Sequence, residues 1–419
     1  MTSLPAAVLP AGIRSRFIDG VNGLRVHILE AGHDGADRPL IVLLGLAADG
    51  RVTSPGTFAM VAKIGGMRIM LKQWCIVAFA CLFALPATAQ FARQPGAAKL
   101  VTEEFQVSAR DDPALKLYVR NKRPLDMTRF SPERTLVYVH GATYPAETAF
   151  DLPLDGMSWM DFIASRGFDV YLLDMRGYGR SSRPAAMDKP AADSLPLTTT
   201  EQAVQDVAAV VEFVRGRRSL PKLNLLGWSW GTSIMASYAA QYPETVERLA
   251  LYAPVWIRTT PSLVQVSGPL GAYRTVSREA ALGRWLTGVA DDKKAALIPP
   301  GWFDAWADAT FASDPGGAAQ NPPVLRAPNG VVQEGQLFWS AGKATYDPAA
   351  LTMPVLLTLG EWDRDTPPYM AQTLFPLLTR SPGKRLVMLG EGTHSILMER
   401  NRLELFHVVQ DFLEADLGK

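Results

Sequence analysis

From about residue 99 to the end of the chain, stretches with strand character alternate with stretches of helical periodicity. Short apolar runs typical of buried strands are followed by segments in which apolar residues recur every three or four positions. Parallel strands need a crossover between them, so this alternation predicts an α/β fold: a mostly parallel sheet with helices on both faces. The expected strands are 105–108, 115–119, 135–139, 168–174, 221–226, 249–252, 354–359 and 385–389.

Helices are expected between these strands. Thr198 and Glu201 have the spacing of a capping box ahead of a periodic apolar pattern. Residues from about 258 to 348 interrupt the alternation and are rich in Gly, Pro and aromatic side chains. A structureless loop of this length is uncommon in a compact domain, so an inserted helical lid or cap is predicted here. The other expected helices are 232–242, a stretch within 369–379, and 396–413, with two more in the cap near 278–289 and 302–311.

Gly227 to Gly231 read Gly-Trp-Ser-Trp-Gly, which fits the pattern G-x-S-x-G. The pentapeptide lies between an expected strand and an expected helix, where a sharp turn would present the Ser229 hydroxyl above the sheet edge. Side chains at the two glycine positions would collide with the neighbouring strand and helix. The pattern alone is weak, but its position predicts that Ser229 is a nucleophile.

A serine hydroxyl needs a base in contact with it to act as a nucleophile at neutral pH. The chain has five histidines. His27 and His33 lie far upstream, His407 lies within an expected helix, and His140 directly precedes Gly141, where it would shape a loop. His394 follows the last strand and is the predicted base, with a packing role as the alternative.

The base in turn needs a carboxylate that fixes its tautomer and stabilises its charged form. Three acids follow the strand 354–359, namely Glu361, Asp363 and Asp365. Asp363 is the first choice, Asp365 the competitor and Glu361 the third. The strand 249–252 is not followed by an acid.

An oxyanion formed on the substrate needs backbone donors. The N–H of Trp230, after the nucleophile, is one expected donor, and the second is expected from Ala142, with Thr143 next. The aromatic residues of the cap predict a mainly apolar pocket. The predicted substrate-binding residues are Thr143, Trp228, Trp302 and Trp306.

Five motifs in order resemble the α/β-hydrolase superfamily across residues 99–419. The resemblance implies an eight-stranded sheet and a hydrolase activity, usually on carboxylic esters. Ser229 stands where epoxide hydrolases and haloalkane dehalogenases have an aspartate, which disfavours those two activities. The Asp363 assignment follows the family pattern G-x-x-D. The motifs are His140-Gly141, DMRGYGRS at 174–181, GWSWG at 227–231, GEWDRDTP at 360–367 and GEGTHS at 390–395.

The expected function is hydrolysis of small to medium carboxylic esters with an apolar moiety, through an acyl-enzyme on Ser229. The Ser-Trp-Gly of the turn is also similar to proline-iminopeptidase-type enzymes, so an aminopeptidase is the runner-up. It would need cap acids such as Glu279, Asp304 or Asp308 to hold an ammonium group. A non-catalytic binding protein of hydrolase shape is the third hypothesis, and the sequence leaves the substrate and the oligomeric state open.

Composition excludes several other classes. The formal net charge is +1, which gives no electrostatic reason to expect nucleic acid. The two cysteines, Cys75 and Cys81, lie in one apolar run, and the histidines form no metal-binding pattern. We expect no cofactor and no metal, and a small-molecule ester as the partner.

Residues 67–89 have the layout of a secretory signal peptide. Arg68 and Lys72 form a positive start, 74–85 is an apolar run, and a small-x-small pattern ends at Ala89. The run is shorter than the roughly 20 residues that span a bilayer, so a permanent membrane anchor is disfavoured. A buried core helix is the alternative. Use of the signal would place the domain 90–419 in the periplasm or outside the cell, and otherwise it would be cytoplasmic.

Residues 1–66 resemble the opening strands of epoxide-hydrolase-like α/β-hydrolases over about 45 residues. Strands are expected at 17–18, 24–29 and 39–44, but Gly45-Leu46 stands where the family has His-Gly. The same three-strand order recurs after residue 99. We interpret 1–66 as a fragment of another hydrolase or sequence upstream of a start at Met67 or Met70. The alternative is a genuine extension that packs as an extra edge.

Overall fold

The computed structural model describes residues 13–21, 24–31, 41–45, 99–264 and 269–416. The chain divides into two compact units, Met1–Arg93 and Gln94–Lys419. In the first unit β1 (Ile13–Val21), β2 (Leu24–Ala31) and β3 (Ile41–Gly45) form an antiparallel three-stranded sheet, and this confirms the three expected strands. The predicted signal peptide at 67–89 lies outside the described residues.

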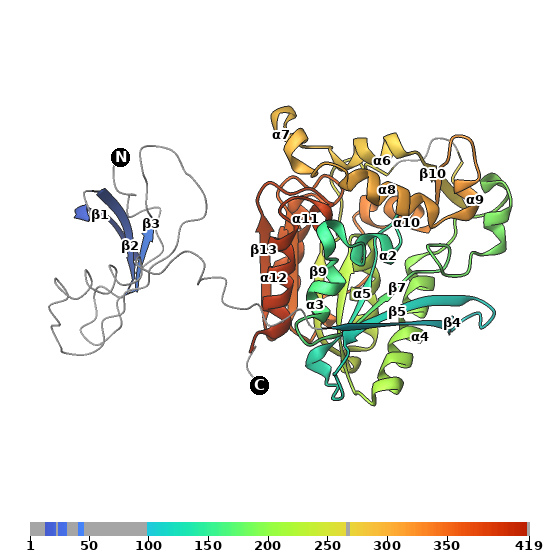
Figure 1. Cartoon of the computed structure of the whole chain (residues 1–419), viewed down its shortest axis with the longest axis horizontal. Coiled ribbons are helices and arrows are strands. Elements are labelled where there is room, and N and C mark those ends of the chain that lie inside the picture. Colours follow the sequence, from blue (N-terminus) through green and yellow to red (C-terminus); the bar gives the residue numbers. More distant parts are fainter. Residues whose placement is uncertain (1–12, 22–23, 32–40, 46–98, 265–268, 417–419) are drawn as a thin grey trace. The chain divides into compact units, whose positions relative to one another are not determined.

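The second unit is built on an eight-stranded, mostly parallel sheet (Figure 1). Its strand order is β13-β12-β9-β8-β6-β7-β5-β4, and the antiparallel pairs are β4–β5 and β5–β7. The α/β prediction is therefore confirmed. The strands are β4 (Leu100–Ser108), β5 (Lys116–Pro124), β6 (Thr135–Val139), β7 (Asp169–Leu173), β8 (Leu223–Trp228), β9 (Val246–Tyr252), β12 (Val355–Gly360) and β13 (Lys384–Leu389).

Helices cover both faces of this sheet, and its central strands are therefore buried on both sides. In β6, Val137 and Val139 belong to one apolar cluster, while Leu136 and Tyr138 belong to the other. This is the alternation that a strand's pleat imposes. The first cluster includes side chains of α4 (Thr200–Arg218), α5 (Trp230–Gln241) and α11 (Pro368–Leu374), and the second those of α2 (Ala146–Phe150), α3 (Trp159–Ala164) and α12 (Arg402–Glu414).

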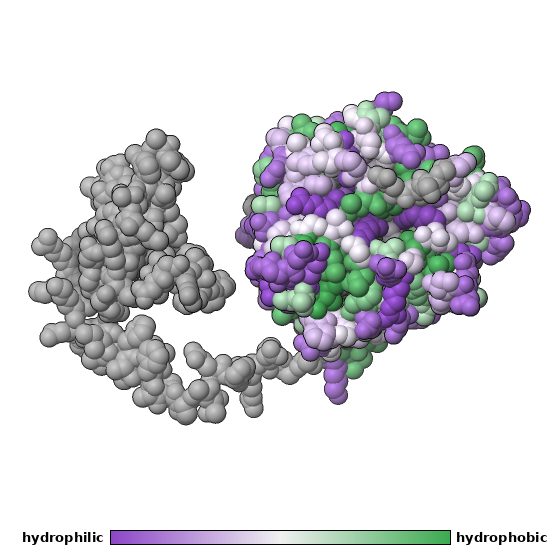
Figure 2. Space-filling view, turned by 90° about the horizontal axis from the view of Figure 1, so that it is seen from above, coloured by the Kyte–Doolittle hydropathy of each residue, from purple (hydrophilic) through white to green (hydrophobic). Residues whose placement is uncertain are grey.

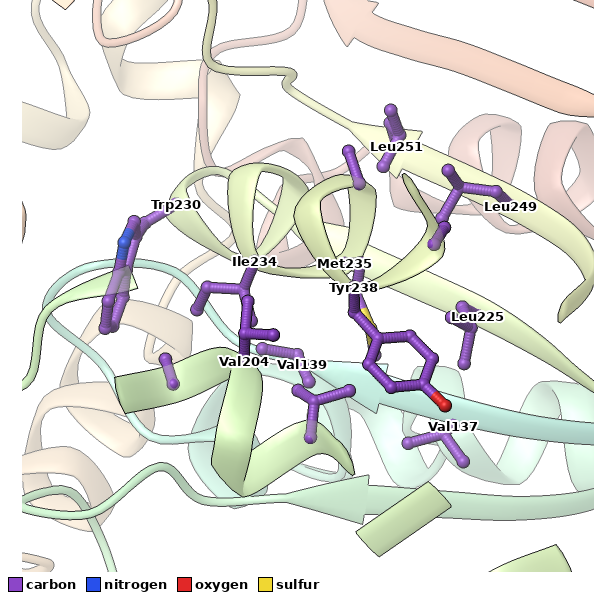
Figure 3. Close-up of a cluster of buried hydrophobic side chains, with 14 of the residues drawn as sticks. Val137, Val139, Val204, Leu225, Trp230, Ile234, Met235, Tyr238, Leu249 and Leu251 are labelled. Carbon is purple, nitrogen blue, oxygen red and sulfur yellow. The ribbon is translucent and has the colours of Figure 1, made fainter. Parts of the chain in front are cut away.

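The face covered by α5 shows how the helix after the turn at Ser229 is anchored. Ile234 points from α5 toward Val139 and Val204, while Met235 and Tyr238 lie near Leu225 and Val137 (Figure 3). Full burial of each aliphatic side chain contributes about 1.5–3 kcal/mol. The start of α5 is thus held rigidly on the sheet.

The start of α4 differs from the expected capping box by one residue. Thr199 is the N-cap, and its side chain and that of Gln202 form the reciprocal pair. Thr198 instead has φ 59°, and its hydroxyl donates to the carbonyl of Arg176 at 3.2 Å. Because Thr198 takes the left-handed turn before the helix, the next residue reaches the extended conformation that an N-cap needs.

Residues 253–354, the inserted segment, lie between β9 and β12 and contain most of the helices at the top of Figure 1. The expected helices near 278–289 and 302–311 are present as α6 and α8. The antiparallel pair β10–β11 was not expected. The elements are β10 (Tyr273–Val276), α6 (Arg278–Trp285), α7 (Asp291–Leu297), α8 (Trp302–Ala312), α9 (Pro315–Ala318), β11 (Leu325–Pro328) and α10 (Gly330–Leu337).

The surface seen from above in Figure 2 has hydrophobic residues in separate groups among hydrophilic ones. Within the described parts of the chain, no helix has both the length and the apolar character needed to cross a membrane.

The strand register brings the ends of four strands to one edge of the sheet. Val139 of β6 is paired with Gly227 of β8, and Gly360 of β12 is paired with Leu389 of β13. Loops that leave the carboxyl ends of neighbouring parallel strands lie close together. The residues that follow these four strands therefore meet above the sheet.

Candidate active site

Ser229 lies on a sharp turn between β8 and α5. Its backbone has φ 56° and ψ −123°, a conformation that non-glycine residues adopt rarely and that marks functional turns. The Ser229 N–H donates to the carbonyl of Tyr252 at 2.9 Å, and its own carbonyl accepts from the N–H of Thr232 at 2.8 Å. The strained turn is thus held from β9 and from α5, and the serine is buried with 6% of its surface exposed.

The glycines around Ser229 are required by close backbone approaches. A Cβ on Gly227 would lie 2.4 Å from the carbonyl oxygen of Gly231, and one on Gly231 would lie 2.6 Å from that of Val139. Gly141 lies on the loop after β6, and a Cβ at this position would lie only 3.0 Å from the Cβ of Ser229. The structure therefore has the collisions that were expected at the two glycines of the pentapeptide.

His394 lies on the loop after β13, and its Nδ1 is 2.8 Å from Oδ2 of Asp363. The backbone carbonyl of His394 accepts from the hydroxyl of Tyr252 at 2.6 Å and from Nε1 of Trp228 at 3.1 Å. Burial alone would lower the pKa of His394, but the negative charges of Asp363 and Asp365 together raise it above its ordinary value. The imidazole is therefore fixed in place and made more basic.

The three candidate acids have different partners. Asp363 is fully buried, and besides His394 it accepts from the N–H and the hydroxyl of Thr366, both at 2.8 Å. Asp365 forms an ion pair with Arg284 at 2.8 Å. Glu361 accepts from the backbone N–H of Glu391. Of the three, only Asp363 contacts the imidazole.

Ser229 and His394 line one narrow cavity of about 20 Å³. Between these two described side chains there is no direct hydrogen bond in the structure. Such contacts are often loose without substrate and tighten when it binds. The cavity is also lined by Gly141, Ala142, Thr143, Tyr144, Trp228, Ala281, Arg284, Trp285, Asp365 and Ser395.

The two expected oxyanion donors lie beside Ser229. Trp230 is the first residue of α5, so its N–H has no acceptor within the helix. The N–H of Ala142 belongs to the same peptide group as the Gly141 carbonyl, which lies 2.7 Å from Nδ1 of His140. Ala142 lines the narrow cavity together with Ser229.

His140 orients that peptide group as a neutral side chain. Its Nε2 accepts from the N–H of Met175 at 3.0 Å, so Nδ1 carries the hydrogen and donates to Gly141. Burial lowers the pKa of His140 to about 4. A histidine that stays neutral and holds a backbone loop fits the shaping role expected from the sequence.

The predicted substrate-binding residues separate into two groups. Thr143 and Trp228 line the narrow cavity, whereas Trp302 and Trp306 line neither this cavity nor the wider one beside it. Trp306 is buried and packs edge-on against Tyr144, with ring centroids 4.7 Å apart. The Arg402 guanidinium lies over the ring of Trp302 at 4.3 Å. The contacts of these two tryptophans are therefore with other protein side chains, outside the linings of the two cavities at Ser229.

Arg258, Arg284 and Trp285 are among the cavity residues that were not predicted as site residues from the sequence. Arg284 and Trp285 are the last two residues of α6, which was expected as a cap helix. The periodicity of this helix does not show which of its faces is turned toward Ser229. Arg258 lies in the segment after β9, and nothing local distinguishes it from a surface arginine. The expected mainly apolar pocket therefore has charged groups in its wall.

Comparisons with known proteins agree with this geometry. The sequence model of a family described as alpha/beta hydrolase fold matches residues 135–401. The chain is 29% identical to the (lyso)-N-acylphosphatidylethanolamine lipase of Mus musculus over 27% of this chain and 35% of that protein. It is 26% identical to protein ABHD8 of Bos taurus over 57% and 48% of the two chains. The chain thus spans less than half the length of these two relatives.

Two solved structures are similar in fold. One is a membrane phospholipase A, with a TM-score of 0.50 and 20% identity, covering 81% of this chain and 98% of that one. The other is the 2-hydroxy-6-oxo-6-phenylhexa-2,4-dienoate hydrolase from Rhodococcus sp. strain RHA1, with a TM-score of 0.50 and 18% identity, covering 75% and 99%. At these identities the likeness concerns the fold.

Proposed function

Since the chain belongs to the alpha/beta hydrolase fold family, we propose that it is a serine hydrolase that cleaves carboxylic esters through an acyl-enzyme on Ser229. One observation carries the proposal. Ser229 has a strained backbone conformation at the end of β8 and lines the same cavity as His394, whose Nδ1 is 2.8 Å from the buried Asp363 carboxylate. The lipase named among the relatives supports ester bonds as the target.

In the proposed reaction the Ser229 hydroxyl attacks the ester carbonyl and gives its proton to Nε2 of His394. This nitrogen is available because Nδ1–H donates to Asp363, which stabilises the imidazolium. The N–H groups of Trp230 and Ala142 would bind the oxyanion, and each such donor is worth about 3–4 kcal/mol. The alcohol leaves with the proton from His394. A water molecule then cleaves the acyl-enzyme by the same route, and the proton returns to Ser229.

The aminopeptidase alternative has less support. Asp304 and Asp308 of α8 both pair with Arg278 at 2.6 Å and are more than 70% exposed. Neither they nor Glu279 belong to the cavity linings at Ser229. The charged side chains in these linings are Arg258 and the ion pair of Arg284 with Asp365, and their net positive charge would repel the ammonium group of a peptide substrate.

The test measures covalent labelling and substrate choice together. A fluorophosphonate probe should label the folded protein, and Ser229→Ala should remove the label and lower kcat for p-nitrophenyl butyrate by more than about a thousandfold. An alanyl or prolyl p-nitroanilide should be a much poorer substrate. Faster cleavage of the anilide would favour the aminopeptidase. A folded protein that the probe does not label would favour a binding protein.

A further inference from the structure

A second, wider cavity of about 290 Å³ opens beside Ser229. Its walls combine apolar side chains with a few polar ones, the arrangement typical of small-molecule sites. Ser229, Ala142 and Trp230 form the end where the reaction is proposed to occur. The apolar walls come from Val255, Val264, Val331, Val332 and Trp339, and the polar groups from Arg258, Ser262, Arg284, Gln336, Ser340, Asp365 and Thr366.

The charges in this lining do not balance. Arg284 is satisfied, because its Nε and Nη2 lie 2.9 and 2.8 Å from Oδ1 of Asp365 and its Nη1 donates to the Thr143 hydroxyl at 3.1 Å. Asp365 is the one carboxylate in the lining, and it is already bound bidentately. Two guanidinium groups and one carboxylate leave one positive charge facing the cavity.

Arg258 carries the uncompensated charge. Its Nη2 donates to the backbone carbonyl of Asp365 and its Nη1 to that of Pro261 at 3.4 Å, and no described carboxylate pairs with it. Burial lowers the pKa of Arg258, and the nearby negative charges of Asp365 and Asp363 offset this effect only in part. A half-buried guanidinium without an anion is costly, and a planar carboxylate is the ligand that best matches its fork of donors.

A second buried cation strengthens the positive potential at the serine end. Arg274 of β10 donates to the carbonyl of Ala142 at 2.7 Å and to the hydroxyl of Thr143 at 2.9 Å. Its other hydrogen bonds go to the carbonyls of Pro328 and Ala327 and to the side chain of Asn329, none of them charged. A monoanion in the wide cavity would therefore be attracted by more than Arg258 alone.

We infer that the wide cavity binds a carboxylate carried by the substrate, with Arg258 as the residue that determines this specificity. This inference rests on the proposed function and names its substrate class: an ester with an apolar chain that ends in a carboxylate. The valines and Trp339 would pack on the chain, and the carboxylate would meet Arg258. A single negative charge fits the single uncompensated positive charge of the lining.

The test compares two esters that differ only in the far group. Mono-p-nitrophenyl adipate ends in a carboxylate, and the p-nitrophenyl ester of adipamic acid ends in a neutral amide of the same size. With rates corrected for the reaction without enzyme, wild type should show a kcat/KM at least about tenfold higher for the carboxylate. Arg258→Gln should reduce that ratio to near one.

Arg380→Gln is the matched control, because Arg380 is exposed and lies in neither cavity lining, and it should keep the wild-type ratio. Equal kcat/KM for the two esters with wild type, or an unchanged ratio in Arg258→Gln, would overturn the inference while leaving the ester hydrolase in place. Cleavage of neither ester, without labelling by the fluorophosphonate, would instead refute the proposed function. The wild-type comparison decides the matter even if the variant does not fold.

Discussion

At the residue scale, two aspartates two positions apart serve different partners. Asp363 binds the imidazole of His394, while Asp365 binds the guanidinium of Arg284. Both carboxylates raise the pKa of the imidazole through their charge, but only Asp363 fixes its orientation. The hydrogen bond to the imidazole therefore distinguishes Asp363, the proposed orienting acid, from Asp365, which affects His394 only through its charge.

We predict that Asp363→Asn lowers kcat for p-nitrophenyl butyrate by about 10⁴-fold, because an amide holds the imidazole in the wrong tautomer. Asp365→Asn should cost much less, roughly tenfold or below, since the Asp363 contact remains. Steady-state kinetics of the two variants at one pH make the comparison. Thermal melts show whether both variants are folded. A larger loss of kcat in Asp365→Asn than in Asp363→Asn would identify Asp365 as the orienting acid.

At the element scale, the β8–α5 turn depends on the close approach of the Gly227 backbone to that of Gly231. Gly227→Ala should destabilise the protein by about 3 kcal/mol or more, because its Cβ would lie 2.4 Å from the Gly231 carbonyl oxygen. Gly216→Ala is the same substitution on the exposed side of α4, where a Cβ meets nothing within 4 Å. It should stabilise the protein by about 0.5–1 kcal/mol. Denaturant unfolding of both variants tests the opposite signs, and equal effects would contradict the packing argument.

Glu399 joins the inserted segment to the loop that carries His394. Its carboxylate accepts from Nε1 of Trp285 in α6 at 2.8 Å and from the N–H of Thr393 at 3.1 Å, and the Thr393 hydroxyl also donates to it. Burial raises the pKa of Glu399 from 4.5 to about 7. The group that connects these two elements therefore changes its charge near neutral pH.

This pKa has a consequence for stability. The folded state binds the Glu399 proton more tightly than the unfolded state, so its contribution is complete below about pH 4.5 and is lost as the pH rises through about 7. The loss is on the order of 3 kcal/mol. Melting temperatures measured from pH 5 to 8 should fall less in Glu399→Gln than in wild type. Glu404→Gln, an exposed change on α12, should follow wild type, and parallel curves for all three proteins would refute the prediction.

The sequence predicted those parts of the fold and site that depend on local pattern. The strands, the turn at Ser229 and the order of motifs follow from periodicity and from glycine spacing, and the described structure has them. The capping box was one residue out because the left-handed turn at Thr198 has no signal in residue type. Trp302 and Trp306 lie outside the two cavity linings at Ser229, and Arg258 and Arg284, which do line them, were not predicted. Their partners come from other elements, and only tertiary packing decides which face of a helix meets the serine.

At the scale of the whole molecule, the second unit contains a complete sheet. Its eight strands all come from residue 100 onward, and β4 and β5 supply the antiparallel edge. The first unit has β1, β2 and β3 in a three-stranded sheet of their own. The boundary between the units falls between Arg93 and Gln94, close to the predicted cleavage after Ala89. We propose on this basis that residues 1–89 are dispensable for the folded hydrolase.

We predict that the chain 90–419 has a melting temperature within about 2 °C of the full chain, because no strand of the eight-stranded sheet is removed. Its kcat/KM for p-nitrophenyl butyrate should also be unchanged within about twofold. The shorter chain keeps every residue proposed to act on the ester, because the first of them is Ala142. Scanning calorimetry and steady-state kinetics on both chains give the comparison. A matched deletion that also removes β4, the chain 110–419, should melt much lower, because it exposes the paired edge of β5. A fall of more than about 5 °C in the chain 90–419 would correspond to more than about 3 kcal/mol of lost stability and would show that the first unit packs as part of the hydrolase.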